Sequence, residues 1–205
     1  MIRLDREGDL WIVTLDRPDK RNALTASMLT DLTGILKMAG GARALILTGA
    51  GEVFSAGADL DEVRAGTLAK SPLWEEVSGL IAGLPGLTVA ALNGTLAGGA
   101  MGMALACDLR LAAEGATFFY PTLKMGVMPQ PSDPRRLAAL VGPSRAKLLL
   151  LAGQRWDADT ALDAGLVDGV FGREALLDRA RALCSAALEA PAGLVGQTKT
   201  LLPKA

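Results

Sequence analysis

Short apolar runs alternate with segments of helical periodicity along this chain of 205 residues, and this alternation constrains the fold more than any other feature. Apolar runs of a length that suits buried strands lie at residues 10–15, 42–48, 87–92 and 108–112. Helical spacing follows Thr25, a predicted N-cap, and recurs at residues 73–83 and 100–106. The last third is mostly helical, at about residues 133–140, 144–151, 157–164 and 174–188. Strands and helices that alternate through short connections predict an α/β fold.

No linker or low-complexity stretch divides the chain. We therefore predict a single unit, with an α/β core over residues 1–140 and a helical part over residues 141–205 that serves in oligomerisation. Half of the residues are hydrophobic. That fraction is enough for a full core and leaves apolar side chains for a subunit interface.

Composition excludes several classes of function. The chain has no histidine, which excludes catalytic triads, general bases and metal sites built on that residue. Its two cysteines, Cys107 and Cys184, lie far apart in apolar runs. A disulfide between them stays open, but two buried free thiols are the favoured interpretation, and we predict no metal site.

Charge and hydropathy also limit the partners. A net charge of −1 gives no overall field that would attract nucleic acid or an anionic membrane. The first ten residues carry charges throughout, unlike the apolar core of a signal peptide. No apolar stretch is long enough to span a membrane without a charge, glycine or proline. We predict a cytoplasmic protein that binds neither nucleic acid nor membrane.

Two glycine-rich segments have the composition of ligand-binding backbone. Residues 53–60 (VFSAGADL) follow a predicted strand, and residues 93–99 (NGTLAGG) lead from another strand into a helix. Small residues let backbone N–H groups approach a ligand, and two such groups aimed at one point form an oxyanion hole. Tight packing of helix on sheet explains either segment alone equally well. The glycine spacing excludes a dinucleotide-binding loop.

Further motifs follow one another in order along nearly the whole chain. They are Leu15 to Leu24 (LDRPDKRNAL), Phe54 to Leu60, Ala91 to Gly99 with Ala106 to Arg110, Thr117 to Gly142, and Ala161 to Asp168 (ALDAGLVD). In this order they resemble the crotonase (enoyl-CoA hydratase/isomerase) family. The resemblance implies a spiral of ββα turns, here with a shortened helical C-terminal region. It also implies a trimer or a dimer of trimers and a role in fatty acyl-CoA metabolism.

The resemblance further implies a binding site for an acyl-CoA thioester, with coenzyme A as part of the substrate and no permanently bound cofactor. The N–H groups of Ala58 and Gly99 would hold the thioester oxygen. The remaining coenzyme A contacts would come from Lys20, Arg21, Ala23, Ala56, Asp59 and Leu60. Lys20 and Arg21 either reach the phosphates or are solvated loop charges.

Two catalytic residues of the family are replaced in this chain. Hydratases of the family use two glutamates, one as base and one as acid. The first lies three residues after the oxyanion glycine, where this chain has Gly102. The second follows the proline of the next segment, where Thr122 follows Pro121. We therefore do not expect a conventional hydratase.

Other side chains remain as candidates near the acyl group. Gln130 stands where some relatives carry an aspartate. A glutamine side chain cannot act as a base. Asp133, within Ser132-Asp133-Pro134, is interpreted more readily as part of a helix N-cap than as a base. Glu62 is more readily a solvated charge than a group in the acyl pocket. Tyr120, the only tyrosine, is either a hydrogen-bond donor to the substrate or a packed aromatic.

Three functions are compatible with these features. The first is an enzyme of the enoyl-CoA hydratase/isomerase type that uses the oxyanion hole with another acid or base. The second is a non-catalytic acyl-CoA carrier, favoured by the missing glutamates. The third is a structural subunit of a crotonase oligomer.

Overall fold

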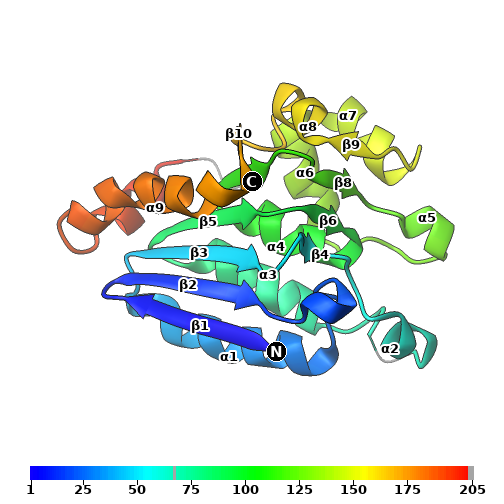
Figure 1. The fold of residues 1–205 in the computed structure, drawn as a ribbon, viewed down its shortest axis with the longest axis horizontal. Coiled ribbons are helices and arrows are strands. Elements are labelled where there is room, and N and C mark those ends of the chain that lie inside the picture. The colour runs from blue at the N-terminus through cyan, green and yellow to red at the C-terminus, as the bar shows by residue number, and fades with distance from the viewer. Residues whose placement is uncertain (67, 203–205) are drawn as a thin grey trace.

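The strands of the protein form two mostly parallel sheets, and from β3 onward the chain passes back and forth between them. The computed structural model describes residues 1–66 and 68–202. The larger sheet has the order β1-β2-β3-β5-β7-β10, in which all neighbours are parallel except β1 and β2 (Figure 1). Its strands are β1 (Ile2–Glu7), β2 (Leu10–Leu15), β3 (Ala44–Gly49), β5 (Leu87–Leu92), β7 (Leu109–Ala113) and β10 (Gly169–Phe171).

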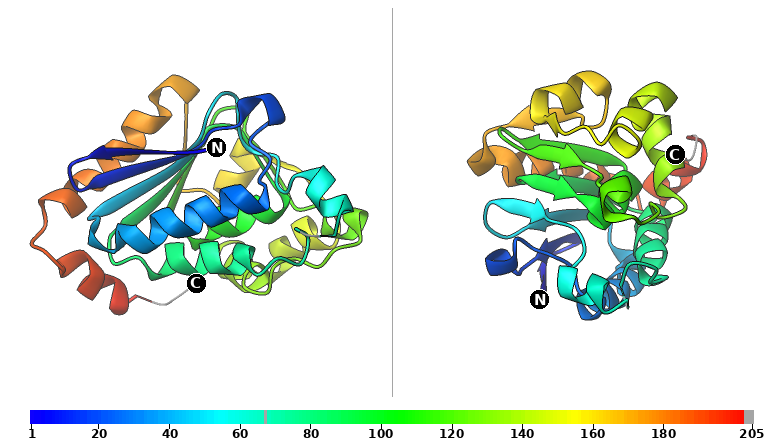
Figure 2. Two further views of the ribbon diagram at one scale, coloured as in Figure 1. Left: turned by 90° about the horizontal axis from the view of Figure 1, so that it is seen from below. Right: turned by 90° about the vertical axis from the view of Figure 1, so that its right-hand side faces the viewer.

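Helices cover both faces of this sheet. Alternate residues of its strands point to opposite faces, so Leu45 and Leu47 of β3 pack with α1 (Ala26–Met38), α3 (Leu73–Gly83) and α4 (Met101–Ala106). Ala44 and Ile46 pack on the other face against α9 (Arg173–Glu189). Figure 2 shows the strands between α1 and α3 on one side and α9 on the other. Burial on both faces explains why these strands are continuous apolar runs.

The smaller sheet has the order β4-β6-β8-β9, formed by β4 (Val53–Ser55), β6 (Thr95–Ala97), β8 (Thr117–Phe119) and β9 (Trp156–Asp157). A short strand of this sheet follows each of β3, β5 and β7, and helices follow each short strand. The unit of long strand, short strand and helix therefore repeats. This repeat is the predicted spiral of ββα turns, and the fold class is confirmed.

Most of the predicted elements are present within a residue or two. Thr25 caps α1 by accepting a hydrogen bond from the N–H of Met28. The C-terminal helices are α6 (Asp133–Val141), α7 (Pro143–Leu150), α8 (Ala158–Ala164) and α9, as predicted, followed by α10 (Leu194–Thr200). The periodicity did not indicate the short helices η1 (Pro18–Lys20), η2 (Ala39–Gly41), α2 (Leu60–Arg64), η3 (Gly98–Ala100) and α5 (Thr122–Met125).

Both cysteines are buried free thiols, as predicted. Burial raises the pKa of Cys107 to about 12 and that of Cys184 to about 11, so neither is a reactive thiolate at neutral pH. Among the described helices, none combines the length and apolar character needed to cross a bilayer.

Candidate functional site

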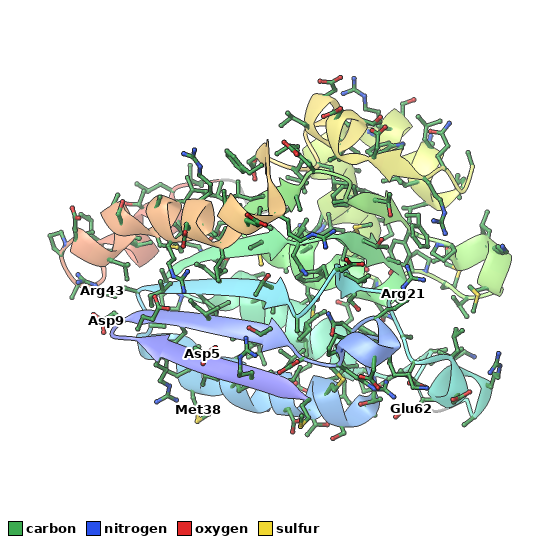
Figure 3. All side chains as sticks on the ribbon, in the orientation of Figure 1. Asp5, Asp9, Arg21, Met38, Arg43 and Glu62 are labelled. Atoms are coloured by element: carbon green, nitrogen blue, oxygen red, sulfur yellow. The ribbon has the colours of Figure 1, made fainter. Side chains whose placement is uncertain are left out.

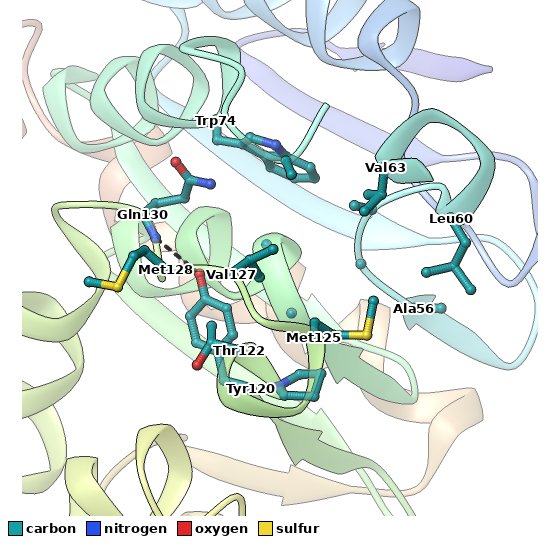
Figure 4. Close-up of a pocket in the computed structure, with 16 residues that line it drawn as sticks. Ala56, Leu60, Val63, Trp74, Tyr120, Thr122, Met125, Val127, Met128 and Gln130 are labelled. Atoms are coloured by element: carbon teal, nitrogen blue, oxygen red, sulfur yellow. Dashed lines mark hydrogen bonds between the residues drawn. The ribbon is translucent and has the colours of Figure 1, made fainter. Parts of the chain in front are cut away.

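The two glycine-rich segments predicted from the sequence meet at one pocket. The pocket encloses about 120 Å³, several times the roughly 10–15 Å³ that one water requires by the same measure. Gly57 and Ala58 of the first segment and Gly98 and Gly99 of the second line it. In Figure 4, Leu60 and Val63 of α2 lie on one side of this pocket, and Tyr120 and Thr122 lie on the opposite side.

The two segments touch through their backbones, which requires glycine. Gly57 and Gly98 both have positive φ, 96° and 55°. A Cβ at Gly57 would lie 2.9 Å from the carbonyl oxygen of Ala97, closer than side chains tolerate. A residue other than glycine at position 57 would therefore push the segments apart.

The N–H of Ala58 takes no part in the backbone pairing of its segment with Leu24. Leu24 forms a parallel bridge with Ala58, in which the N–H of Leu24 donates to the oxygen of Gly57 and the N–H of Asp59 donates to the oxygen of Leu24. Successive N–H groups of an extended chain point in opposite directions. The N–H of Ala58 is therefore directed away from Leu24.

Gly99 lies in the first turn of η3, which continues directly into α4. N–H groups of a first helical turn have no partner within the helix, so they are free to bind an acceptor outside it. The ring of Trp74 covers this glycine, and a Cβ there would lie 3.2 Å from two ring carbons. The Trp74 indole N–H donates to the oxygen of Leu68, which fixes the ring in this position.

Buried polar side chains that the sequence did not single out hold the first segment in place. The side-chain N–H groups of Asn22 donate to the oxygens of Ala50 at 2.9 Å and Val53 at 2.6 Å. The hydroxyl of Ser55 donates to the oxygen of Asn22 and accepts from the N–H of Gly57. Asn93, predicted only as a turn residue, binds Gly49 and Gly51 of the same loop. A buried asparagine after a strand is the signal that could have identified this support.

The carboxylate of Asp59, a residue predicted to bind coenzyme A, has partners within the chain. It caps α2 through the N–H groups of Asp61 and Glu62, and it pairs with Arg17 at 2.7 Å. The hydrogen bond from Arg17 lowers the pKa of this carboxyl. Asp59 does not line the pocket formed by the described residues.

The predicted coenzyme A residues fall into two groups. Ala56, Ala58, Leu60 and Gly99 line the pocket. Lys20, Arg21 and Ala23 lie beside it, where the N–H of Ala56 donates to the oxygen of Arg21. Figure 3 places Arg21 at the same end of the molecule as Glu62, opposite Arg43 and Asp9. Lys20 and Arg21 are exposed, and no ion pair within the described ranges involves either of them.

Tyr120, Thr122 and Gln130, predicted as pocket residues, all line the pocket. Tyr120 is nevertheless almost fully buried, at 3% exposure. Its hydroxyl donates to Oδ2 of Asp133 at 2.7 Å and accepts from the backbone N–H of Gln130 at 3.4 Å. Tyr120 is therefore a packed aromatic, and its hydroxyl hydrogen is donated to Asp133.

The interpretation of Asp133 as a cap residue is wrong for its side chain. Helix α6 begins at Asp133, but no side chain of Ser132 or Asp133 caps it. The carboxylate of Glu75, from α3, instead accepts from both the N–H and the hydroxyl of Ser132, at 3.1 and 2.9 Å. Glu75 thus frees the Asp133 carboxylate, which is 1% exposed and points toward Gly102 and Tyr120.

Burial raises the pKa of the Asp133 carboxyl to about 6, and the negative charge of Glu75 acts in the same direction. The hydrogen bond from Tyr120 and the charge of Arg136 oppose this rise. Burial likewise raises the pKa of Tyr120, and its neighbour Asp133 adds to the rise. Tyr120 is therefore a neutral phenol, and Asp133 changes charge close to neutral pH.

Glu62 is not a solvated charge, and it does not reach the pocket enclosed by the described residues. Its Oε2 accepts from the N–H of Ala26, at the start of α1, at 2.8 Å. A carboxylate at a helix N-terminus is favoured by the helix dipole. Its role as a candidate acid is not supported by this position.

Fold and site together define a protein built from ββα turns, with a pocket between two glycine-rich backbone segments. The model of the family described as enoyl-CoA hydratase/isomerase matches residues 5–205. The short-chain-enoyl-CoA hydratase of Clostridium acetobutylicum is 34% identical over 190 residues, which cover 89% of this chain and 73% of that protein. The 2,3-dehydroadipyl-CoA hydratase of Escherichia coli is 34% identical over 191 residues, with the same coverage.

Solved structures agree with this result. An enoyl-CoA hydratase from Bacillus anthracis superposes with a TM-score of 0.88 at 29% identity, over 97% of this chain and 82% of that one. The Pseudomonas aeruginosa protein PA4980 superposes with a TM-score of 0.89 at 34% identity, over 98% and 89% of the two chains. The chain belongs to the enoyl-CoA hydratase/isomerase family, the crotonases.

Proposed function

We propose that the chain binds an acyl-CoA thioester in this pocket and stabilises an enolate of it, without acting as a conventional hydratase. The observation that carries the proposal is the meeting of two backbone segments, at Ala58 and Gly99, on one apolar pocket. Two N–H groups directed at the thioester oxygen would stabilise negative charge on it by several kcal/mol. An enolate, rather than a hydrated product, is proposed because Gly102 and Thr122 cannot activate water.

The coenzyme A moiety would lie along the Leu15–Leu24 segment. Lys20 and Arg21 are exposed beside the pocket and are suited to contact phosphates through their charges. The adenine would rest against backbone near Ala23 and Ala56. The carboxylate of Asp59 is engaged by Arg17 and by the start of α2, so a contact from this residue would come from its backbone.

Calorimetric titration with crotonyl-CoA and with a long-chain acyl-CoA, followed by product analysis of the same samples, tests the proposal. We expect saturable binding and a converted thioester. Binding with an unchanged thioester would indicate the non-catalytic carrier instead. Absence of binding would contradict the proposal and leave a structural role.

A pair of glycine variants tests whether the acyl-CoA thioester binds at this pocket. Gly99→Ala puts a methyl group against the Trp74 ring, so the ring or the backbone of residue 99 must shift by a few tenths of an ångström. We expect at least about tenfold weaker binding from that shift in oxyanion geometry. Gly79→Ala is the control, because nothing lies within 4 Å of the added methyl group. Equal affinities for the two variants would argue against Gly99 as a contact.

We also propose that copies of the chain assemble as a trimer or a dimer of trimers. Leu148, Leu151 and Leu162 support an interface, since all three are exposed by 37% or more on or beside α7 and α8. Light scattering of the purified protein measures the assembly directly, and a monomeric mass would contradict it.

A further inference from the structure

A buried carboxylate occupies the space that a side chain at position 102 would fill. A Cβ added to Gly102 would lie 2.6 Å from Oδ1 of Asp133 and 3.1 Å from Oδ2. Such a contact is impossible without movement, so the glycine at 102 and the carboxylate of Asp133 depend on each other. Helix α4, which carries Gly102, begins directly after the turn that holds Gly99. The carboxylate is therefore held just behind the proposed oxyanion site.

This carboxylate is incompletely satisfied. Oδ2 accepts the Tyr120 hydroxyl, whereas Oδ1 is buried and has no hydrogen-bond partner within the part of the chain that the structure describes. A buried oxygen without a donor costs about 1–3 kcal/mol, so a purely structural role explains it poorly. Buried acids with raised pKa values are typical of proton-transfer sites.

Tyr120 connects the carboxylate to the pocket. The phenol lines the pocket, and its oxygen uses its hydrogen for Asp133 and one lone pair for the N–H of Gln130. A hydroxyl oxygen has a second lone pair, for which no hydrogen bond is formed within the described residues, and Figure 4 shows Tyr120 among the side chains that line the pocket. The Tyr120–Asp133 hydrogen bond is thus a continuous path from pocket to carboxylate.

We propose that Tyr120 and Asp133 act as the proton-transfer pair of this pocket, replacing the acid and base that the chain lacks at positions 102 and 122. The inference rests on the proposed function. The C–H bond next to the thioester carbonyl breaks, and its proton moves to the Tyr120 oxygen as the phenolic proton moves to Oδ2 of Asp133. The electron pair enters the enolate, whose oxygen the N–H groups of Ala58 and Gly99 hold. Return of a proton to the same carbon, or to the γ-carbon of an unsaturated acyl group, restores both residues.

In this scheme Tyr120 touches the substrate and Asp133 is a positioning residue that accepts the proton. The charged groups around the pair are Glu75 on α3 and Arg136 on α6. They act in opposite directions on the carboxyl, so its proton affinity is set mainly by burial. A carboxylate with a pKa of about 6 is ionised at neutral pH and matched to the operating range of a base.

Exchange of hydrogen for deuterium in 3-butenoyl-CoA tests the pair. The chain is incubated with this thioester in D2O, and mass spectrometry follows deuterium in the acyl group together with conversion to 2-butenoyl-CoA. We expect exchange by the natural chain, with a rate that rises with pH through about 6 as Asp133 ionises. Asp133→Asn and Tyr120→Phe should each lower the rate at least about 100-fold, which is typical for the loss of a general acid or base.

Binding is measured on the same samples, so that the two proposals fail differently. Both variants should bind 3-butenoyl-CoA within about threefold of the natural chain. Asp157→Asn is the matched control, because it removes an aspartate at the start of α8 that does not line the pocket and leaves a side chain that still caps a helix. Thioester binding without exchange, or exchange that survives both variants at more than a third of the natural rate, would overturn the pair. Loss of binding by the natural chain would overturn the proposed function as well.

Discussion

At the scale of single residues, the most informative side chain is Asp133, whose burial has a consequence for stability as well as chemistry. Its pKa of about 6 in the folded protein lies above 3.8, the value of an unperturbed aspartate. Protons therefore bind more tightly to the folded state than to the unfolded one between those values. The stabilisation is fully present below about pH 4 and is lost as the pH rises through about 6.

Asp133→Asn removes this dependence and keeps a side chain that accepts the Tyr120 hydroxyl. We expect the free energy of unfolding of the natural chain to fall, relative to the variant, by on the order of 3 kcal/mol between pH 4 and pH 7. Urea unfolding at several pH values measures the difference, and other carboxyls cancel in the comparison. A difference that is constant over this range would mean that Asp133 titrates normally.

At the scale of elements, the loop between β2 and α1 is held by one asparagine in a left-handed conformation. Asn22 has a φ of 53° and is fully buried, and its side chain makes three hydrogen bonds to backbone atoms. Two effects therefore fix this residue, its polar side chain and its tolerance of positive φ.

Two substitutions separate these effects. Asn22→Gly keeps the backbone conformation and loses the hydrogen bonds, so we expect a loss of about 2–4 kcal/mol in the free energy of unfolding. Asn22→Ala should lose about 1 kcal/mol more, because a Cβ is strained at positive φ. Arg21→Gly is the control: Arg21 has a φ of 54° and is exposed, so glycine there should be neutral or stabilising. Equal unfolding free energies for the two Asn22 variants would contradict the backbone contribution.

The elements differ in how well the sequence predicts them. Continuous apolar runs and helical spacing identified four central strands and the long helices because one local pattern determines each. Strand β1 was missed because it lies at the edge of the sheet and carries charges, and β4, β6 and β8 have only three residues each. The glycine segments were predicted to lie at one pocket because their small residues are visible in the sequence itself. The pairs Arg17–Asp59, Ala26–Glu62 and Tyr120–Asp133 were not predicted, since each joins two different elements of the chain.

At the scale of the whole molecule, the C-terminal segment closes the structure by returning to the sheet. Arg43, next to β3, donates to the oxygens of Leu188 and Ala190, at the C-terminal end of α9. Cationic donors at that end satisfy free carbonyls and are favoured by the helix dipole. Helix α9 in turn covers the second face of the sheet with Leu176, Ala180 and Cys184. The attachment of the chain after α9 therefore supports a whole layer of the fold, on the side away from α1 and α3.

Lys199 of α10 makes the last of these attachments. Its Nζ donates to the oxygens of Leu84 and Gly86 and pairs with Asp108 at 2.7 Å, in a position only 21% exposed. Lys199→Met keeps most of the apolar length but removes a donor from the carbonyls of Leu84 and Gly86 and a cation from Asp108, so we expect a loss of about 1–3 kcal/mol in the free energy of unfolding. Amide hydrogen exchange should become faster in α10 and in the turn before β5, while affinity for 3-butenoyl-CoA stays unchanged because neither region lines the pocket. Lys147→Met, on the exposed part of α7, is the control. If the Lys199 variant also weakened thioester binding, α10 would be coupled to the site, and the expected independence of stability and binding at Lys199 would be wrong.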